Sequence, residues 1–149
     1  MWLDELSDEA VAALTAAGWT RDRAVDVMAW DEKIRSDGFV VSEFAYAWWR
    51  SLGGLTVPPA RRGGPQLLID PTGPQGYGGW PAVWADRFAQ SFCPVGVRND
   101  RDGIWVGAKG VVITEFGGSQ VKKAADGPAA AMDVLLFGRP LWRWWGSAP

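Results

Sequence analysis

The chain has 149 residues, of which 48% are hydrophobic and 21% charged, and its formal net charge is −2. This length predicts one domain, with a core large enough to fold without a metal or a disulfide. The sequence holds one cysteine and no histidine. It therefore excludes an intramolecular disulfide, catalysis by a histidine base, and the commonest zinc ligand sets.

The N-terminus reads Met-Trp-Leu-Asp-Glu-Leu, which is acidic where a secretory signal is basic and then apolar. No apolar run reaches the 18 residues that a membrane-spanning helix needs. From these two features we expect a cytoplasmic protein with no membrane partner.

Three helices are expected before residue 55, over residues 7–18, 26–38 and 42–53. Capping side chains stand at their starts and glycines at or just beyond their ends. Apolar residues recur at helical spacing along them and include Trp30 in the second and Trp48 in the third.

Charge is unevenly distributed along the chain. Residues 1–43 hold ten acids and four bases, a net charge of −6, whereas residues 44–149 hold seven acids and eleven bases. Asp31, Glu32 and Asp37 lie off the apolar stripe of the second helix, and periodicity predicts them to be its most exposed acids. This acidic surface is either the solvated face of helices or a contact for a basic partner, and it would repel nucleic acid.

The second half of the chain carries the strand patterns. Short apolar runs predict strands near 55–57 and 66–70 and a three-stranded meander near 93–115, with hairpin turns at its glycine-containing gaps. The fold class is therefore α+β, an antiparallel sheet with the N-terminal helices and a C-terminal helix packed on it.

The segments between these elements are defined by proline and glycine. Residues 58–81 are Pro/Gly-rich and, apart from the strand at 66–70, are expected to form loops; Pro81 starts a helix that runs to about Ser91. Residues 116–126 are predicted to be a connecting loop before a last helix that ends at Gly138.

Eleven tryptophans are an unusual number for this length. Five lie on predicted core stripes: Trp19, Trp30, Trp48, Trp84 and Trp105. Three more, Trp142, Trp144 and Trp145, follow the last helix in the tail 139–149. Fully exposed, these three would show roughly 450–750 Å², whereas the largest apolar patch of a typical monomer is about 300–600 Å². They are therefore either packed on the domain or in contact with another chain.

Sequence motifs for catalysis or metal binding are weak. Cys93 precedes Pro94 at a strand start, which favours a buried structural thiol over a nucleophile. The segment 99–103 resembles part of a calcium-binding loop. With Gly103 at the turn position of such a loop, Arg98 and Lys109 would fall at ligand positions, which they cannot serve, so a hairpin turn is preferred.

A hydrolase that uses carboxylates is the remaining catalytic alternative, with Asp70, Asp86 and Glu115 as its candidates. It requires these acids to converge in a closed pocket. We expect no enzyme, no metal and no cofactor.

An ordered set of residues resembles the third group of the SUKH superfamily over about residues 10–138. The set comprises Ala17-Gly18-Trp19, Arg23, Val25-Asp26, Trp30, Gly38-Phe39, Gly53-Gly54-Leu55, Cys93-Pro94-Val95-Gly96, a hairpin over 104–111 and a final helix near 130–138. The resemblance implies an α+β fold without shared catalytic residues. It also implies a bacterial immunity protein that binds and blocks a cognate polymorphic toxin, often a nuclease or another nucleic-acid-modifying enzyme.

From the resemblance we expect a single SUKH-like domain over residues 1–149. The segment 58–81 and the tail 139–149 fall outside the family pattern, as an insertion and an extension. The candidate contacts for the toxin are the acids Asp31, Glu32 and Asp37 first, and the tail tryptophans second. The alternative is a regulatory or protein-interaction module, because the superfamily also contains members that are not immunity proteins.

Overall fold

The structure is a computed structural model that describes residues 1–139 and the backbone of residues 142–145. Its helices and strands are, in chain order, a 3₁₀ turn η1 (Trp2–Glu5), α1 (Asp8–Ala16), α2 (Met28–Ser36), α3 (Glu43–Leu52), β1 (Thr56–Val57), β2 (Leu67–Leu68), α4 (Trp80–Phe88), β3 (Phe92–Arg98), β4 (Asp102–Gly107), β5 (Val112–Phe116), β6 (Gln120–Ala125), α5 (Pro128–Phe137) and β7 (Trp142–Trp145). The expected α+β class is confirmed.

Within the described residues, one antiparallel sheet holds the strands in their sequence order, β1 to β7. The meander therefore extends beyond the three strands that the sequence predicts, and it includes the expected strands near 55–57 and 66–70. The turn between β3 and β4 has left-handed backbone at Asn99 and Asp100 (φ 55° and 53°), as a tight hairpin turn requires.

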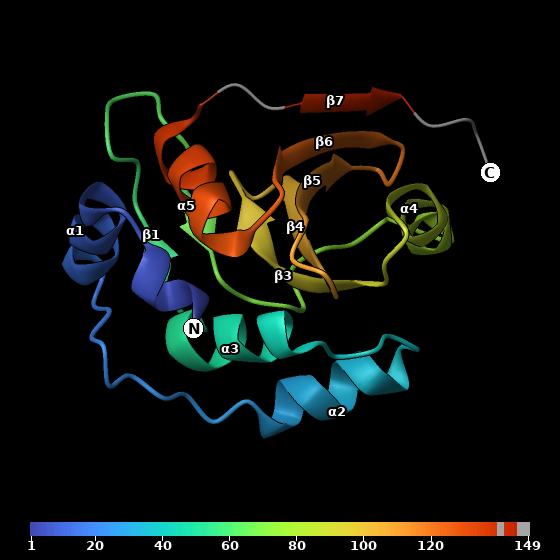
Figure 1. The fold of residues 1–149 in the computed structure, drawn as a ribbon, viewed down its shortest axis with the longest axis horizontal. Coiled ribbons are helices and arrows are strands. Elements are labelled where there is room, and N and C mark those ends of the chain that lie inside the picture. Colours follow the sequence, from blue (N-terminus) through green and yellow to red (C-terminus); the bar gives the residue numbers. More distant parts are fainter. Residues whose placement is uncertain (140–141, 146–149) are drawn as a thin grey trace.

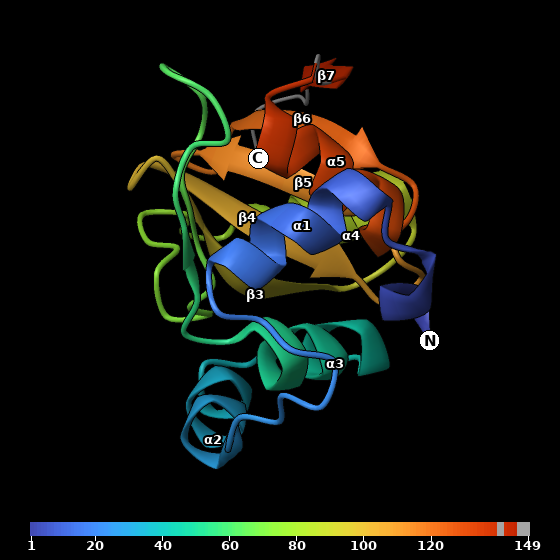
Figure 2. The ribbon, with the colours of Figure 1, turned by 90° about the vertical axis from the view of Figure 1, so that its left-hand side faces the viewer.

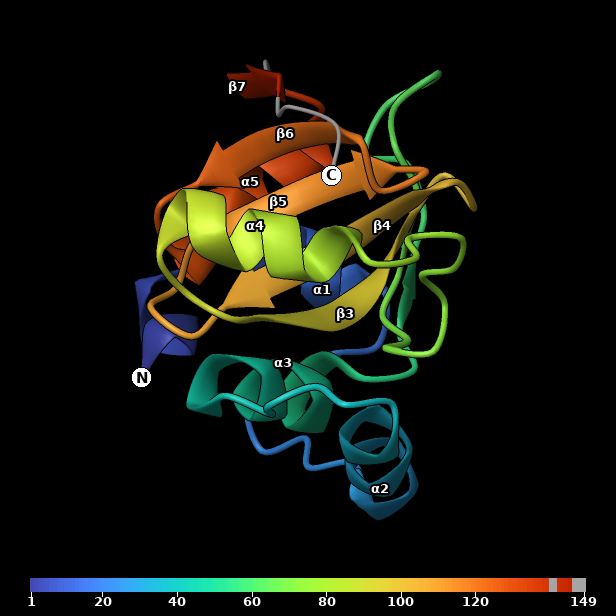
Figure 3. The ribbon, with the colours of Figure 1, turned by 90° about the vertical axis from the view of Figure 1, so that its right-hand side faces the viewer.

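The helices cover both faces of the sheet (Figures 1 and 3). Figure 3 shows α4 across one face, with α1 and α5 behind the other. In Figure 1, α3 lies beneath the sheet and α2 lies beneath α3, so α2 is an outer layer at one end of the molecule. Figure 2 shows the same order from the side, with β7 at the end opposite α2.

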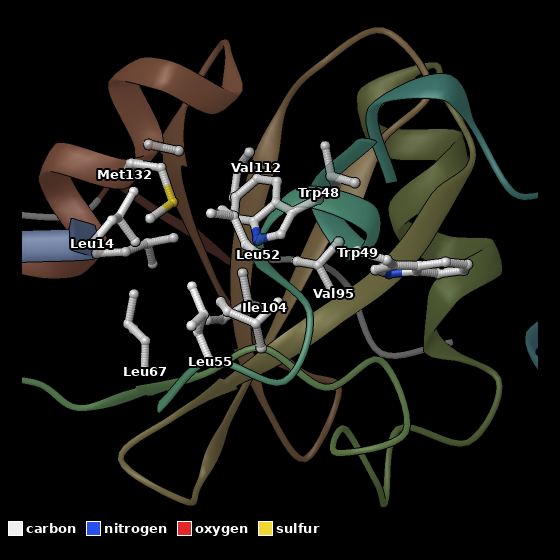
Figure 4. Packing of buried hydrophobic residues seen from close by; sticks show 14 of the residues in the cluster. Leu14, Trp48, Trp49, Leu52, Leu55, Leu67, Val95, Ile104, Val112 and Met132 are labelled. Carbon is white, nitrogen blue, oxygen red and sulfur yellow. The ribbon is translucent and has the colours of Figure 1, made fainter. Parts of the chain in front are cut away.

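Alternation along the strands divides the core into two clusters. Ile104, Val106 and Val112 belong to the larger cluster, which α1, α3 and α5 complete; Trp105 and Ile113 point to the smaller one under α4. Figure 4 shows the larger cluster, with side chains from helices and strands meeting between the layers. A period of two along a strand places successive residues on opposite faces, which explains this division.

Indole hydrogen bonds link the helices to the sheet at defined points. Trp49 Nε1 on α3 donates to the Pro94 carbonyl at 3.0 Å, and Trp84 Nε1 on α4 donates to the Gly118 carbonyl at 2.9 Å. Both tryptophans are fully buried. Because a buried N–H without a partner is costly, these bonds fix how each helix is rotated against the sheet.

The prediction of a loop over residues 116–126 is wrong, because residues 120–125 form strand β6. Gly117 and Gly118, both at positive φ (64° and 83°), make the turn that returns the chain alongside β5. Among residues 120–123 only Val121 is apolar. The strand therefore lacks the apolar alternation on which the sequence reading depended.

Two smaller boundaries also differ from expectation. Helix α4 ends at Phe88 instead of continuing to about Ser91, because Ala89 is left-handed (φ 56°) and Phe92 begins β3. In the tail, residues 142–145 form β7, which pairs antiparallel with β6. The sequence did not predict this strand, and the side chains of Trp142, Trp144 and Trp145 lie outside the described part of the structure.

Candidate partner-binding surface

Helix α3 presents one face to the core and the opposite face to solvent. Ser42 caps its start by accepting the Ala45 amide at 3.2 Å. Trp48 and Trp49 are fully buried, whereas Tyr46 and Arg50, four residues apart on the other side, are exposed. This spacing places Tyr46 and Arg50 next to each other along the outer face of the helix.

The loop before α2 is held against the C-terminal end of α3. The Arg23 guanidinium donates to the Ser51 carbonyl at 3.1 Å, and the Val25 amide donates to the Arg50 carbonyl at 2.8 Å. Both bonds satisfy carbonyls at the helix end that have no partner within the helix. Arg23, which carries part of the family resemblance, therefore has a structural role here.

Helix α2 meets α3 at Gly53, where the side chain of Trp30 covers the end of the helix. A Cβ atom at Gly53 would lie within 3.0 Å of both the Trp30 ring and the Trp49 carbonyl. Gly53 has ordinary backbone angles (φ −55°, ψ 137°). Glycine is therefore required by this close approach, and the backbone conformation is open to any residue.

Two open hollows flank the ridge that Tyr46 and Arg50 form. Groove 1, of about 460 Å³, lies between this ridge and residues 24–28, with Asp31 at its edge. Groove 2, of about 720 Å³, lies on the other side, where Met1, Arg35, residues 41–43, Ala47 and Ser51 complete its lining. Both grooves share Tyr46 and Arg50, so they form one continuous surface.

Large apolar side chains are exposed around this same surface. Among the described residues, five large hydrophobic side chains are exposed: Met1 (75%), Met28 (65%), Val40 (63%), Tyr46 (40%) and Phe116 (45%). Three of the five, Met1, Met28 and Tyr46, line groove 1 or groove 2. Exposed apolar groups gathered beside hollows mark surfaces suited to binding.

The three acids predicted on α2 differ in their surroundings. Asp31 pairs with Arg35 at 2.9 Å and Asp37 with Lys33 at 2.8 Å, and their side chains are only 29% and 32% exposed. Glu32 is exposed and has no ion pair within the described residues. Of the three acids predicted to be exposed, Glu32 and Asp37 are exposed residues, whereas Asp31 is half-buried beside Arg35 one turn away.

The structure also separates these acids from one another. Asp31 lines groove 1, whereas Asp37 lines a third hollow of about 350 Å³ between α2 and residues 71–78. Strand β7, which holds the tail tryptophans, lies at the end of the molecule opposite α2 (Figures 1 and 2). The backbone of β7 and the acids of α2 therefore lie at opposite ends of the molecule.

The carboxylates proposed for a hydrolase have separate surroundings. Glu115 is 2% exposed and accepts the Gly118 amide at 2.8 Å and Trp105 Nε1 at 3.1 Å. Asp70 accepts both the amide and the hydroxyl of Thr72, and Asp86 is exposed on α4. Burial raises the pKa of Glu115, and the two N–H donors oppose that shift.

No group of three or more acids, cysteines or histidines in the described residues could hold a metal ion. Cys93 is 1% exposed, and burial raises the pKa of its thiol to about 12. The expectation of a buried structural thiol is thus confirmed. Over the same described part of the chain, none of the helices has the length and apolar character needed to cross a membrane.

An α+β domain with two open grooves beside the Tyr46–Arg50 ridge has a surface suited to binding another macromolecule. The comparisons with known proteins agree with this class, because the model of the SUKH-3 immunity protein family matches residues 6–138. The chain belongs to that family. Searches of curated proteins and of solved structures find no match. The matched region includes the segment 58–81 and stops before the tail 139–149.

Tyr46 and Arg50 were not among the candidate contacts predicted from the sequence. The available signal was their spacing: residues 46 and 50 lie opposite the stripe of Trp48, Trp49 and Leu52. An aromatic side chain on the polar face of an amphipathic helix is unusual, and it could have indicated a candidate binding residue.

Proposed function

We propose that this chain binds the cognate toxin domain of a polymorphic toxin system and neutralises it by occluding the toxin's active site. The family match over residues 6–138 carries the proposal. Two features of the chain support a binding role: the open surface at α2 and α3, and the excess of acids in residues 1–43. Opposite charge on the partner would speed association, and apolar contacts would slow dissociation.

The direct test uses the gene next to this one. A large secreted protein with a C-terminal toxin domain is expected there. Expression of that toxin domain should stop growth of a host cell, and co-expression of this chain should restore growth. The two chains should also co-purify. If the toxin kills equally with and without this chain, and the two do not bind, the proposal is wrong and a regulatory interaction module becomes the better interpretation.

The acidic surface of α2 is proposed as one part of the contact. Among its three candidate acids, Glu32 gives the cleanest test, because Asp31 and Asp37 are held in ion pairs. Glu32→Lys should lower the association rate several-fold at low salt and reduce the dependence of that rate on salt. Asp86→Lys is the matched control, since Asp86 is also an exposed helical acid but lies on α4. Equal rates and salt dependence for the two variants would reject this contact.

The tail tryptophans are proposed as the second candidate contact. A typical interface covers about 800 Å² of each partner, and β7 and α2 lie at opposite ends of the molecule. One such interface therefore covers one of these regions and leaves the other free. Replacing Trp142, Trp144 and Trp145 together by alanine, beside Glu32→Lys, should weaken toxin binding in one variant only. Weakening in both would require a larger interface.

A further inference from the structure

We propose that the toxin binds across the outer face of α3, with apolar side chains in grooves 1 and 2 and basic groups beside Asp26 and Glu43. Tyr46 and Arg50 form the centre of this contact. The inference rests on the proposed function and adds to it a location and the chemistry of the partner surface.

The surface is a ridge between two hollows. Grooves 1 and 2 hold about 460 and 720 Å³ and share Tyr46 and Arg50 as their common wall. A partner that covers the ridge therefore fills both grooves at once. A partner seated there displaces water from the ridge and from both grooves and so buries the centre of the contact. A buried centre with a polar rim is the usual organisation of a specific interface.

The residue types at this surface are those enriched in protein interfaces. Tyrosine and arginine are enriched among the residues whose loss costs most in protein interfaces, and methionine is enriched at interfaces generally. Tyr46 and Arg50 lie at the centre of the surface, and Met28, which is 65% exposed, lines groove 1. An exposed methionine adapts its shape to a partner at little cost because its side chain is unbranched.

Charge identifies the kind of partner. Every base among residues 1–43 is already engaged: Arg21, Lys33 and Arg35 in ion pairs, and Arg23 on the Ser51 carbonyl. Those ion pairs involve three of the ten acids of this segment, so seven acids have no ion pair within the described residues. The segment thus carries uncompensated negative charge, which favours a basic partner. At the grooves this charge is limited to particular acids, because Arg35 and Arg50 line them as well.

Two of these seven acids lie at the grooves themselves. Asp26 lines groove 1 and Glu43 lines groove 2, on either side of Tyr46. Asp26 accepts the Met28 amide at 3.0 Å through one oxygen, which leaves its second oxygen for a partner. Arg50, without an ion pair in the described residues, is available to a carboxylate or carbonyl of the toxin. The matching surface therefore has a base opposite Asp26, a base opposite Glu43, and a hydrogen-bond acceptor opposite Arg50.

The surface is also held rigid before the partner arrives. The Trp49 bond to Pro94 sets the rotation of α3, and the Arg23 bond to Ser51 holds the wall of groove 1. Binding therefore orders few groups beyond the side chains that touch the toxin. Pre-organisation of this kind lowers the entropic cost of association.

The test measures binding of the neighbouring gene's toxin domain, purified in a catalytically inactive form, to the full chain. Tyr46→Ala should weaken binding at least about 30-fold, the loss typical of a central aromatic contact. Met28→Ala, a second and more exposed position, should weaken it by a smaller factor. Phe116→Ala is the matched control, because Phe116 is exposed to a similar degree (45%) and lies outside both grooves. Thermal unfolding of each variant checks that the fold is kept.

Charge is tested by two isosteric substitutions. Asp26→Asn keeps the oxygen that accepts the Met28 amide, and Glu43→Gln keeps the shape of the side chain. Each should lower the association rate several-fold and flatten its dependence on salt, with little change in the dissociation rate. Unchanged salt dependence in both would overturn the basic-partner argument.

The outcomes separate this inference from the proposed function. Tight binding and protection that survive both Tyr46→Ala and Met28→Ala would overturn the location and leave the function standing. Absence of binding by the wild-type chain would overturn the function itself. Sedimentation equilibrium of the wild-type chain alone is the final control: a dimer that Tyr46→Ala dissociates would assign the face to a second copy of this chain and overturn the inference.

Discussion

Gly53 is the position where a single added methyl group should most directly disturb the α2–α3 surface. A Cβ atom there would lie within 3.0 Å of the Trp49 carbonyl oxygen and of the Trp30 ring. The carbonyl belongs to the backbone of α3 and accepts the Gly53 amide at 2.7 Å, so it cannot move aside without losing that bond. Gly53→Ala must therefore displace the Trp30 ring and shift the end of the helix.

The expected cost follows from overpacking. Inserted methyl groups in well-packed sites cost typically 1–3 kcal/mol, and two rigid neighbours place this site at the upper end, about 2–3 kcal/mol. For a domain of this size each kcal/mol lowers Tm by roughly 2–4 °C, so we expect a decrease of about 4–12 °C. Urea unfolding followed by tryptophan fluorescence and circular dichroism measures the change in free energy of unfolding.

A matched control and a double-mutant cycle isolate the cause. Gly79→Ala should change stability by much less, because a Cβ at Gly79 meets no atom within 4 Å. If Trp30 is part of the clash, Gly53→Ala should cost less when Trp30 is already alanine. A change below about 0.5 kcal/mol in Gly53→Ala, or one no larger than in Gly79→Ala, would refute the reasoning.

Glu115 and Cys93 are buried groups whose ionisation burial disfavours. Burial raises the folded-state pKa of Glu115, so its contribution to stability is complete below the unfolded value, roughly 4.3, and is lost as pH rises through the raised value. The free energy of unfolding of the wild type should thus fall relative to Glu115→Gln as pH increases over that range; an opposite trend would mean that the N–H donors of Trp105 and Gly118 outweigh burial. The Cys93 thiol, with a pKa of about 12, should resist a thiol reagent at pH 8 in the native protein and react once in denaturant, whereas rapid native reaction would contradict its burial.

The grooves change how the acidic charge of the N-terminal segment is interpreted. Periodicity alone directs attention to Asp31, Glu32 and Asp37. Ion pairs neutralise two of them, and the acids that remain at the grooves are Asp26 and Glu43. Net charge counted along a sequence therefore identifies the sign of a surface, and the pairing of side chains decides which charges a partner can reach.

Local chemistry was sufficient for most of the elements. Ser7 and Ser42 cap the helices that they were expected to start, and Gly138 ends α5 at φ 67°. The short apolar runs over residues 93–98 and 104–107 predict β3 and β4. These features depend on a few residues that are neighbours in the sequence, so the sequence alone is sufficient to predict them. The family resemblance, carried by such features, was confirmed by the match over residues 6–138.

Elements that depend on distant partners were not predictable in the same way. Strand β6 has little apolar alternation of its own, and it forms because β5 and β7 supply hydrogen bonds on its two sides. Helix α4 ends at Phe88, since Phe92 is used by β3 in the small core cluster. In both cases the backbone conformation is decided by contacts between segments that the local pattern does not include.

By itself, the sequence determined the fold class, the starts of α1 and α3, the end of α5, the buried cysteine and the sign of the N-terminal charge. The Asp31–Arg35 pair follows from the i,i+4 spacing of these residues on one helix. Only the tertiary structure decided that the Arg23 side chain crosses to the carbonyl of Ser51, because that contact joins two separate segments. It also decided that Tyr46 and Arg50 separate two grooves, since a groove exists only where two segments meet. Spacing along the chain determines which face of a helix a side chain lies on. The opposite wall of a groove is formed by another segment, which only the tertiary structure brings there.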